Sequence, residues 1–173
     1  ILSKMDKIGG AFPSNLAGAS DWGASKINNQ DQRLASHQIL KKAAFLDRDG
    51  VLIADVGHLT NRSQIQVLPG VAQAVKKLND RQVPVVVVTN QSVVGRGLCS
   101  DEDLEDVHRA LREVLGKDQA QIGKIYFCPH HPTAALGAYK TKCQCRKPNS
   151  GMLRQAAQEL GIDLTGSVMV GDN

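Results

Sequence analysis

Four short apolar runs that end in polar residues predict the β-strands of this chain. The clearest run is at positions 85–88, where four consecutive valines precede Thr89 and Asn90. The other three runs lie in AAFLD, KIYFC and SVMVGDN, at residues 43–47, 124–128 and 167–173. Short, nearly continuous apolar runs are typical of strands that are covered on both faces of a parallel sheet.

Between the runs, apolar residues recur at helical spacing and predict three helices, at residues 68–82, 100–116 and 151–161. The first has Pro69 near its start, and the second begins with Ser100 and Asp103 at the spacing of a capping box. Gly116 and Gly161 mark the expected ends of the second and third helices. The residues expected to face the core are Val71, Ala74, Val75 and Leu78, then Leu104, Val107, Leu111 and Val114, and finally Leu153, Ala156, Ala157 and Leu160.

Strands that alternate with helices predict an α/β fold built on a Rossmann-like, doubly wound parallel sheet. We expect one such domain at residues 41–173. Residues 1–40 are rich in Gly, Ser, Asn and Ala without a sustained period, and we expect an irregular N-terminal extension there. In open parallel sheets, ligands bind beyond the carboxyl ends of the strands, so the residues that follow each strand are the first candidates for chemistry.

The composition narrows the class of protein. The 173 residues are 42% hydrophobic and 22% charged, which is typical of a soluble globular domain. The net charge of +4 favours anionic ligands, but the absence of a long Lys/Arg run argues against nucleic acid as a partner. The longest apolar run is far too short to span a bilayer, and the N-terminus lacks the residue order of a signal peptide. We therefore expect a cytoplasmic monomer that binds no membrane.

Carboxylates follow two of the predicted strands. Asp47 and Asp49 stand two positions apart after the first strand, just before Gly50, and Asp172 follows the fourth strand. Neighbouring carboxylates repel each other unless they share a proton or a cation, and a hard cation such as Mg²⁺ suits their oxygen atoms. Two acids in one turn are common on protein surfaces, but three acids at one sheet edge indicate a metal or catalytic site.

Polar and basic residues complete the candidates at this edge. Arg96 is a potential anion contact, and Lys147 could neutralise a transferring phosphoryl group. Taken singly, each is more often an ordinary surface side chain. The residues that follow the second strand offer hydroxyl, amide and backbone N–H groups to phosphate oxygens, and they are Thr89, Asn90, Gln91 and Ser92.

The stretch CPHHPTAALGAYKTKCQCRKP, at residues 128–148, contains three of the four cysteines. Cys128 and His130 are separated by one residue, as are Cys143 and Cys145, with twelve residues between the two pairs. Tetrahedral zinc is bound by such Cys₃His sets, although the one-residue spacers are tighter than usual. A disulfide from Cys128 to either of the other two is also conceivable and would leave an odd thiol. Cys99 stands alone and fits an ordinary small apolar residue.

Four segments, FLDRDGV, VVVVTNQS, CRKP and VMVGD, stand in the order and spacing of the four signature motifs of the haloacid dehalogenase superfamily. The resemblance extends from residue 43 to residue 173. Together with CPHHP and RKPNSGML, the motifs are similar to the branch of heptose bisphosphate and histidinol-phosphate phosphatases, and more closely to the former. This resemblance implies a Mg²⁺-dependent phosphomonoesterase without a large cap domain, acting on a small phosphorylated sugar, with histidinol phosphate as the alternative.

The resemblance also implies roles for the candidates at the strand ends. Asp47 would attack phosphorus and form an aspartyl phosphate, and Asp49 would act as general acid and then as general base. Thr89 and Lys147 would bind phosphoryl oxygens. Mg²⁺ would be held by Asp47, the Asp49 backbone carbonyl and Asp172.

Two loops receive roles from the same resemblance. Asp55 and His58 would belong to a substrate-contacting loop, and Arg146 would contact the distal anionic group of the substrate. The cysteine-rich loop would hold Zn²⁺ in a structural role, because four protein ligands leave no open position for water. The implied zinc ligands are Cys128, His130, Cys143 and Cys145.

The chain departs from the family pattern in three places. Val51 stands where threonine is usual. Val93 stands where glycine is usual, and a β-branched residue would be costly if that position required a positive φ. The sequence stops at Asn173, inside the fourth motif, and we expect the C-terminal elements of the fold to be missing. A zinc-stabilised binding module with an inactive phosphatase fold is therefore a third interpretation.

Overall fold

The computed structural model describes residues 40–172, so the extension expected at residues 1–40 lies outside the described part except for Leu40. Strands and helices alternate along this part of the chain. The strands are β1 (Ala44–Leu46), β2 (Val85–Asn90), β3 (Lys124–Cys128) and β4 (Val168–Val170). The helices are α1 (Val71–Asp80), α2 (Ser92–Gly95), α3 (Asp101–Gly116) and α4 (Gly151–Leu160), with two short 3₁₀ helices, η1 (Arg62–Gln64) and η2 (Gly137–Tyr139).

The four strands form one parallel sheet in the order β3-β2-β1-β4. Ala44 of β1 pairs with Val85 of β2 on one side and with Val168 of β4 on the other. The chain therefore moves outward from β1 to β3 and then returns to the opposite side of β1. In open α/β sheets, ligands bind where the strand order reverses in this way, at the carboxyl ends of the strands. Asp47 and Asp172 follow the two strands on either side of this reversal.

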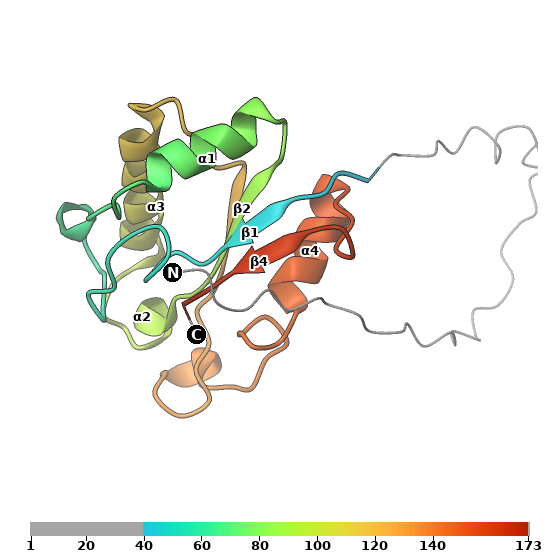
Figure 1. Cartoon of the computed structure of the whole chain (residues 1–173). Helices are drawn as coiled ribbons and strands as arrows, with labels where there is room; N and C mark the ends of the chain where they lie inside the picture. Colours follow the sequence, from blue (N-terminus) through green and yellow to red (C-terminus); the bar gives the residue numbers. More distant parts are fainter. Residues whose placement is uncertain (1–39, 173) are drawn as a thin grey trace, which may run out of the picture.

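Helices cover both faces of the sheet, with α1 and α3 on one face and α4 on the other (Figure 1). Val87 belongs to the same core cluster as Leu111 of α3, whereas Val86 and Val88 belong to the cluster that contains Met152 of α4. Successive residues of β2 thus point to opposite faces, which explains why all its valines are buried. The predicted doubly wound α/β fold and its four strands are confirmed.

Helix α3 begins and ends where the sequence predicts. The Ser100 hydroxyl accepts the Asp103 N–H at 3.1 Å, and the Asp103 carboxylate accepts the Ser100 N–H at 2.9 Å, so the capping box is present. The prediction for its inward face is wrong at one position, because Val114 is 37% exposed while Leu115 is fully buried. The buried row continues from Leu111 to Leu115 at i,i+4 spacing, and Val114 lies beside that row.

In the other two predicted helices, too, some residues that were expected to face the core are exposed to solvent. In α1, Ala72 is buried and Ala74, which was expected to face the core, is exposed. In α4, Met152 and Ala156 are buried, and Leu160 in the last turn is 39% exposed. Each helix contacts the sheet through a narrow row of residues, and apolar residues at the margin of the row face solvent.

The segment between β1 and α1 contains turns, the single helix η1 and isolated bridges that join Ile53 to Asp49 and Val67. The described chain therefore has no cap domain at this point, in agreement with the sequence-based expectation. Val93 lies inside α2, is buried, and has no positive φ, so the valine causes no strain of that kind. Among residues 40–172, no helix is both long and apolar enough to cross a membrane.

Candidate active site

An ion pair between Asp47 and Lys147 lies at the carboxyl end of β1. The backbone N–H of Asp47 donates to the carbonyl oxygen of Val170 in β4 at 2.9 Å. Oδ2 of Asp47 pairs with Nζ of Lys147, which stands 100 positions later, and Oδ1 accepts the backbone N–H of Arg48 at 2.8 Å. The Asp47 and Lys147 side chains are 16% and 23% exposed, so an incoming ligand can reach the pair.

Asp172 lies against the turn that follows Asp49. Gly50 has a φ of +74°, and a Cβ at this position would lie only 2.3 Å from Oδ2 of Asp172. Glycine is therefore required both by the left-handed backbone and by the approach of the carboxylate. This approach gathers Asp47, Asp49 and Asp172 at one end of the sheet. Their oxygens are the hard ligands that Mg²⁺ prefers, and a cation would offset their mutual repulsion.

The side chain of Gln91 links the ends of β1 and β2. Its Nε2 donates to Oδ2 of Asp49 at 2.7 Å and to Oγ1 of Thr89 at 2.8 Å. Because Oγ1 of Thr89 accepts this bond, its own hydrogen can donate elsewhere, for example to a phosphoryl oxygen. Gln91 was expected to contact the substrate, but it is only 3% exposed and its amide holds other site residues.

Asn90 holds the backbone of Lys147. Its Oδ1 accepts the Lys147 N–H at 3.0 Å, and its Nδ2 donates to the Lys147 carbonyl oxygen at 3.3 Å. Two bonds from one amide to one residue fix the start of the lysine side chain. Asn90, another expected substrate contact, therefore orients Lys147 with its side chain. Ser92, the first residue of α2, accepts the Nε hydrogen of Arg96 at 3.2 Å.

Two buried polar residues of the site, Arg48 and His108, are not among the candidates that the sequence motifs indicate. Both are 1% exposed. Arg48 donates to Oδ1 of Asp49 from Nη2 at 3.0 Å and to Oε1 of Gln91 at 2.7 Å, and its Nη1 lies 3.5 Å from Nε2 of His108. The sequence holds one signal for His108, which falls on the buried apolar face of α3, where a polar side chain needs a partner.

Burial is the main cause of a low pKa at His108. Together with the nearby charges of Arg48 and Arg112, burial lowers the pKa of this imidazole from 6.5 to about 3. The ring is therefore neutral at physiological pH. It also packs against Phe127 of β3, with 5.7 Å between the ring centroids.

Replacing His108 with glutamine should make the stability of the protein less sensitive to acid. The unfolded chain takes up a proton below pH 6.5 that the folded ring refuses until about pH 3, so acidification across this window destabilises the folded wild type. Between pH 7 and pH 5 the wild type should lose about 2 kcal/mol more unfolding free energy than His108→Gln. Denaturant titrations at the two pH values measure this difference. The matched change His58→Gln, at an exposed histidine, should keep the wild-type loss. Equal losses in wild type and His108→Gln would contradict the prediction.

Ligand atoms of Cys128, His130, Cys143 and Cys145 all lie within 4.8 Å of one another. Sγ of Cys145 is 3.1 Å from Sγ of Cys128, 3.3 Å from Sγ of Cys143 and 3.4 Å from Nδ1 of His130. All four cysteines of the chain, including Cys99, are free, so the structure contains neither of the conceivable disulfides. Three thiols and one imidazole form the donor set that tetrahedral zinc takes in structural sites. This cluster could therefore hold a metal ion.

The loop at residues 129–147 is tied to the helices on either side of it. A Cβ on Gly95 of α2 would lie 2.3 Å from the carbonyl oxygen of Pro129, so only glycine permits this contact. The N–H of Gly151 at the start of α4 donates to the carbonyl oxygen of Gln144 at 2.9 Å. Figure 1 shows this loop in orange, beyond the carboxyl end of the sheet. An ion in the cysteine cluster would thus fix the segment that leads into Lys147.

Two cations of the candidate site, Arg146 and Arg96, lie near the ring of His131. Nη1 of Arg146 donates to the carbonyl oxygen of His130 at 3.0 Å. The pKa of His131 is lowered, first by burial and then by the charges of Arg146 and Arg96. Nδ1 of the same ring accepts the N–H of Ala134 at 3.0 Å. The loop that precedes Lys147 therefore carries the positive charge of Arg146, with Arg96 of the α2 end close to it, and fits an anionic group.

The predicted substrate loop at residues 55–58 is exposed. Oδ1 of Asp55 accepts the N–H of Gly57 at 2.8 Å, which forms a local turn. His58 stands at the other end of this turn. Within residues 40–172, no hydrogen bond or ion pair of the structure joins Asp55 or His58 to Asp47 or Lys147.

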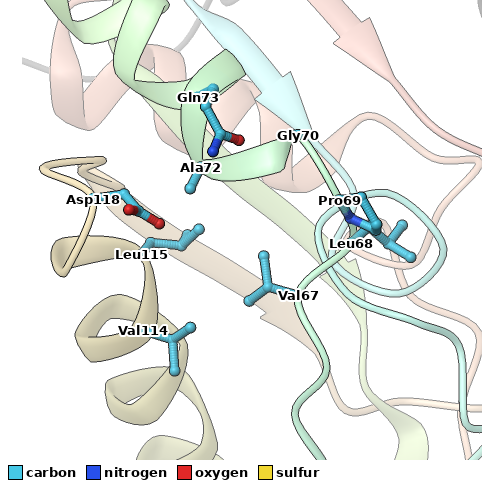
Figure 2. Close-up of a pocket in the computed structure, with 9 residues that line it drawn as sticks. All are labelled: Val67, Leu68, Pro69, Gly70, Ala72, Gln73, Val114, Leu115 and Asp118. Carbon is cyan, nitrogen blue, oxygen red and sulfur yellow. The ribbon is translucent and has the colours of Figure 1, made fainter.

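A hollow of about 250 Å³ lies between the start of α1 and the end of α3 (Figure 2). None of the predicted site residues lines it, so it is separate from the carboxylates at the strand ends. Its lining residues are Val67, Leu68, Pro69, Gly70, Ala72, Gln73, Val114, Leu115 and Asp118.

Comparisons with known proteins agree on one family. The family model described as haloacid dehalogenase-like hydrolase matches residues 11–173. A D-glycero-beta-D-manno-heptose-1,7-bisphosphate 7-phosphatase of Rhodopseudomonas palustris is 38% identical over 133 residues, which cover 77% of this chain and 74% of the relative. A relative with the same name in Haemophilus ducreyi is 42% identical, and the match covers 76% of this chain and 72% of that protein.

A solved structure has a similar fold. It is the D,D-heptose 1,7-bisphosphate phosphatase from B. bronchiseptica, in complex with magnesium and phosphate. The TM-score is 0.69 at 34% sequence identity, and the match covers 76% of this chain and 70% of that chain.

Proposed function

The chain belongs to the haloacid dehalogenase-like hydrolase family as a phosphatase, and we propose that it removes the 7-phosphate of D-glycero-D-manno-heptose 1,7-bisphosphate. The observation that carries this proposal is the ion pair between Asp47 and Lys147 at the carboxyl end of β1. A carboxylate held by a lysine, with a second carboxylate and a hydroxyl at the same sheet edge, fits phosphoryl transfer to an aspartate.

The proposed reaction has two steps. In the first, Asp47 attacks phosphorus while the bond from phosphorus to the C7 oxygen breaks, and Asp49 gives its proton to that oxygen. The sugar leaves as an alcohol, and Asp47 carries the phosphoryl group. In the second step, Asp49 takes a proton from a water molecule whose oxygen attacks phosphorus. The bond to Asp47 then breaks, inorganic phosphate leaves, and both aspartates return to their starting states.

Lys147 and Thr89 bind the phosphoryl oxygens in this proposal. The Lys147 ammonium already contacts the Asp47 carboxylate, so it would also contact a phosphoryl group attached there. The Asn90 amide holds the lysine backbone, and the Gln91 amide leaves the Thr89 hydroxyl hydrogen to donate. Donors that are fixed before the reaction stabilise the charge that develops on the transferring group.

We propose that Mg²⁺ is held by Asp47, the backbone carbonyl of Asp49 and Asp172. The fit rests on an all-oxygen donor set and on the close approach of the Asp172 carboxylate to the Gly50 turn. When bound, Mg²⁺ would offset the negative charge of the carboxylates and of the phosphate group.

We propose that the cluster of Cys128, His130, Cys143 and Cys145 holds Zn²⁺. The chemistry of the donor set supports this, because three sulfur atoms and one nitrogen complete a tetrahedral site without water. Burial, followed by hydrogen bonds with Cys145 and Cys143, raises the pKa of the Cys128 thiol. Zinc binds thiolates, so metal binding there would release protons.

The positive charge of the loop that precedes Lys147 supports a bisphosphate as the substrate. Arg146, with Arg96 nearby, would bind the phosphate that is not hydrolysed. Histidinol phosphate, the substrate of the alternative function, carries an amine at its distal end, which these cations would repel. An inactive binding module is less well supported, because Asp47, Asp49, Thr89 and Asp172 lie at the strand ends and the Lys147 ammonium contacts Asp47 there.

Arg146→Ala should separate binding of the distal phosphate from the chemistry. We expect KM for the heptose bisphosphate to rise about 10-fold, while KM for the heptose 7-phosphate changes less than about 3-fold. Phosphate release in the presence of Mg²⁺ measures both constants. Arg154→Ala is the matched control, because Arg154 is exposed on α4 and bonds Ser150, the residue before that helix. An equal rise for both esters would show that Arg146 does not bind the distal phosphate.

The substrate panel tests the proposal itself. The wild type should hydrolyse the heptose bisphosphate with a kcat/KM about 10²-fold or more above that for histidinol phosphate. The reverse preference would favour histidinol-phosphate phosphatase. Folded, zinc-loaded protein without turnover of any phosphate ester would favour the binding module.

We further propose that the enzyme acts in the synthesis of heptose precursors of lipopolysaccharide, in the cytoplasm. Three of its four cysteines lie in the cluster that could hold a metal ion and none forms a disulfide, a pattern that is usual in a reducing compartment. That the protein is a monomer stays a prediction.

A further inference from the structure

Arg48 is a buried cation between the two catalytic candidates, Asp47 and Asp49. A guanidinium that is 1% exposed must find partners for its hydrogens inside the protein, because water cannot reach them. Nε and Nη2 donate to Oδ1 of Asp49 at 3.2 and 3.0 Å, and Nη2 also donates to Oε1 of Gln91 at 2.7 Å. Nη1 faces away from both, toward His108.

The contact between Arg48 and Gln91 sets which way the Gln91 amide points. Arg48 can only donate, so the oxygen of the amide must face it. The amide nitrogen is then turned toward Oδ2 of Asp49 and Oγ1 of Thr89, at 2.7 and 2.8 Å. In the opposite orientation, two N–H donors would face each other and the Asp49 carboxylate would lose a donor. Arg48 therefore orients both Asp49 and the amide that holds it.

His108 is the partner of the remaining side of the guanidinium. Its Nε2 lies 3.5 Å from Nη1 of Arg48, and within residues 40–172 no other side chain bonds Nη1 in the structure. Because Arg48 donates, Nε2 must accept, and the ring must carry its hydrogen on Nδ1. The ring is held by burial on α3 and by its contact with Phe127.

We propose that His108 is a positioning residue for the acid and base steps: by accepting from Nη1 of Arg48, it fixes the guanidinium that holds Asp49 and Gln91. This inference rests on the proposed function, in which Asp49 is the proton donor and acceptor. An error of about 1 Å in the position of a catalytic group can cost about 10²-fold in rate. The His108 side chain on α3 thus helps to fix the position of the Asp49 carboxylate, although the two do not contact each other.

The leaving group of the substrate distinguishes positioning from general structural support. A sugar alcohol leaves only when it receives a proton, whereas p-nitrophenolate leaves without one, so only the sugar ester depends strongly on Asp49 in the first step. His108→Leu should lower kcat/KM about 10-fold or more for the heptose bisphosphate and less than about 3-fold for p-nitrophenyl phosphate. His108→Gln places an acceptor near Nη1 again and should recover most of the loss. Arg109→Gln, an exposed neighbour on α3, should match the wild type with both esters.

The outcomes separate this inference from the proposed function. Equal losses with both esters, no loss in His108→Leu, or no recovery in His108→Gln would each overturn the positioning role. Wild-type protein that cleaves p-nitrophenyl phosphate but not the heptose bisphosphate would instead overturn the proposed substrate. Nitrogen NMR of histidine-labelled wild type provides a readout that needs no turnover and no variant. The neutral ring with hydrogen on Nδ1 is expected for His108, and hydrogen on Nε2 would refute the contact with Arg48.

Discussion

Asp47→Asn should reduce phosphate release from the heptose bisphosphate by about 10³-fold or more while the chain stays folded. An amide is a far weaker nucleophile than a carboxylate, and the side chain keeps its size and an oxygen that can accept the Arg48 N–H. The lost ion pair with Lys147 is partly exposed, so the unfolding free energy should fall by about 1 kcal/mol. Steady-state phosphate release with Mg²⁺ and a thermal melt measure the two effects.

Asp80→Asn is the matched control for this change. Asp80 also forms an acid–lysine pair, with Lys76 at 2.8 Å, but it lies at the exposed end of α1, away from the strand ends. We expect wild-type turnover from this variant. Wild-type turnover from Asp47→Asn would remove Asp47 as the nucleophile.

Freshly purified protein should contain about one zinc ion per chain, and Cys143→Ser should lose it. The Cys143 sulfur belongs to the cluster, 3.5 Å from the Cys128 sulfur and 3.3 Å from that of Cys145. Without the metal, the segment that leads into Lys147 keeps its hydrogen bonds to the neighbouring elements and its packing against the core, but loses the bonds that join its two ends. We expect kcat to fall about 10-fold to 10²-fold and stability to fall by several kcal/mol, on the order of a small structural zinc site. Elemental analysis, turnover and denaturant titration provide the measurements.

Cys99→Ser is the control for the loss of one thiol. Cys99 is partly buried beside Val93 and Leu104 and does not belong to the cluster, so this variant should keep its zinc and its activity. Absence of zinc from the wild type, or retention of zinc by Cys143→Ser, would contradict the assignment of the metal.

The fold and the location of the site could be predicted because they depend on local patterns. Each strand is a short apolar run. Because ligands bind beyond the carboxyl ends of the strands in open parallel sheets, Asp47 and Asp172 are predicted to be site residues. The core-facing residues of the helices were predicted less well. In α3, Val114 was expected to be buried, but its neighbour Leu115 is buried instead. The choice between these neighbours depends on how α3 lies on the sheet, and periodicity alone does not fix that.

The partners of individual polar side chains could not be predicted from the sequence. Thr89, Asn90 and Gln91 are consecutive, yet the Asn90 side chain bonds the Lys147 backbone and the Gln91 side chain bonds Asp49. These choices depend on contacts between residues 42 and 57 positions apart. The sequence does not indicate Arg48 as a site residue, because a charged residue between two acids in a turn is usually solvent-exposed. Here burial makes it the centre of a hydrogen-bond network instead.

A crystal structure of the protein with Mg²⁺ and beryllium fluoride, a mimic of an aspartyl phosphate, would test whether the strand ends form one phosphoryl-transfer site. We expect beryllium bonded to the Asp47 carboxylate, fluorides in contact with Thr89 and Lys147, and Mg²⁺ between Asp47 and Asp172. Beryllium fluoride bound elsewhere, or Mg²⁺ bound without contact to Asp47 and Asp172, would contradict this expectation.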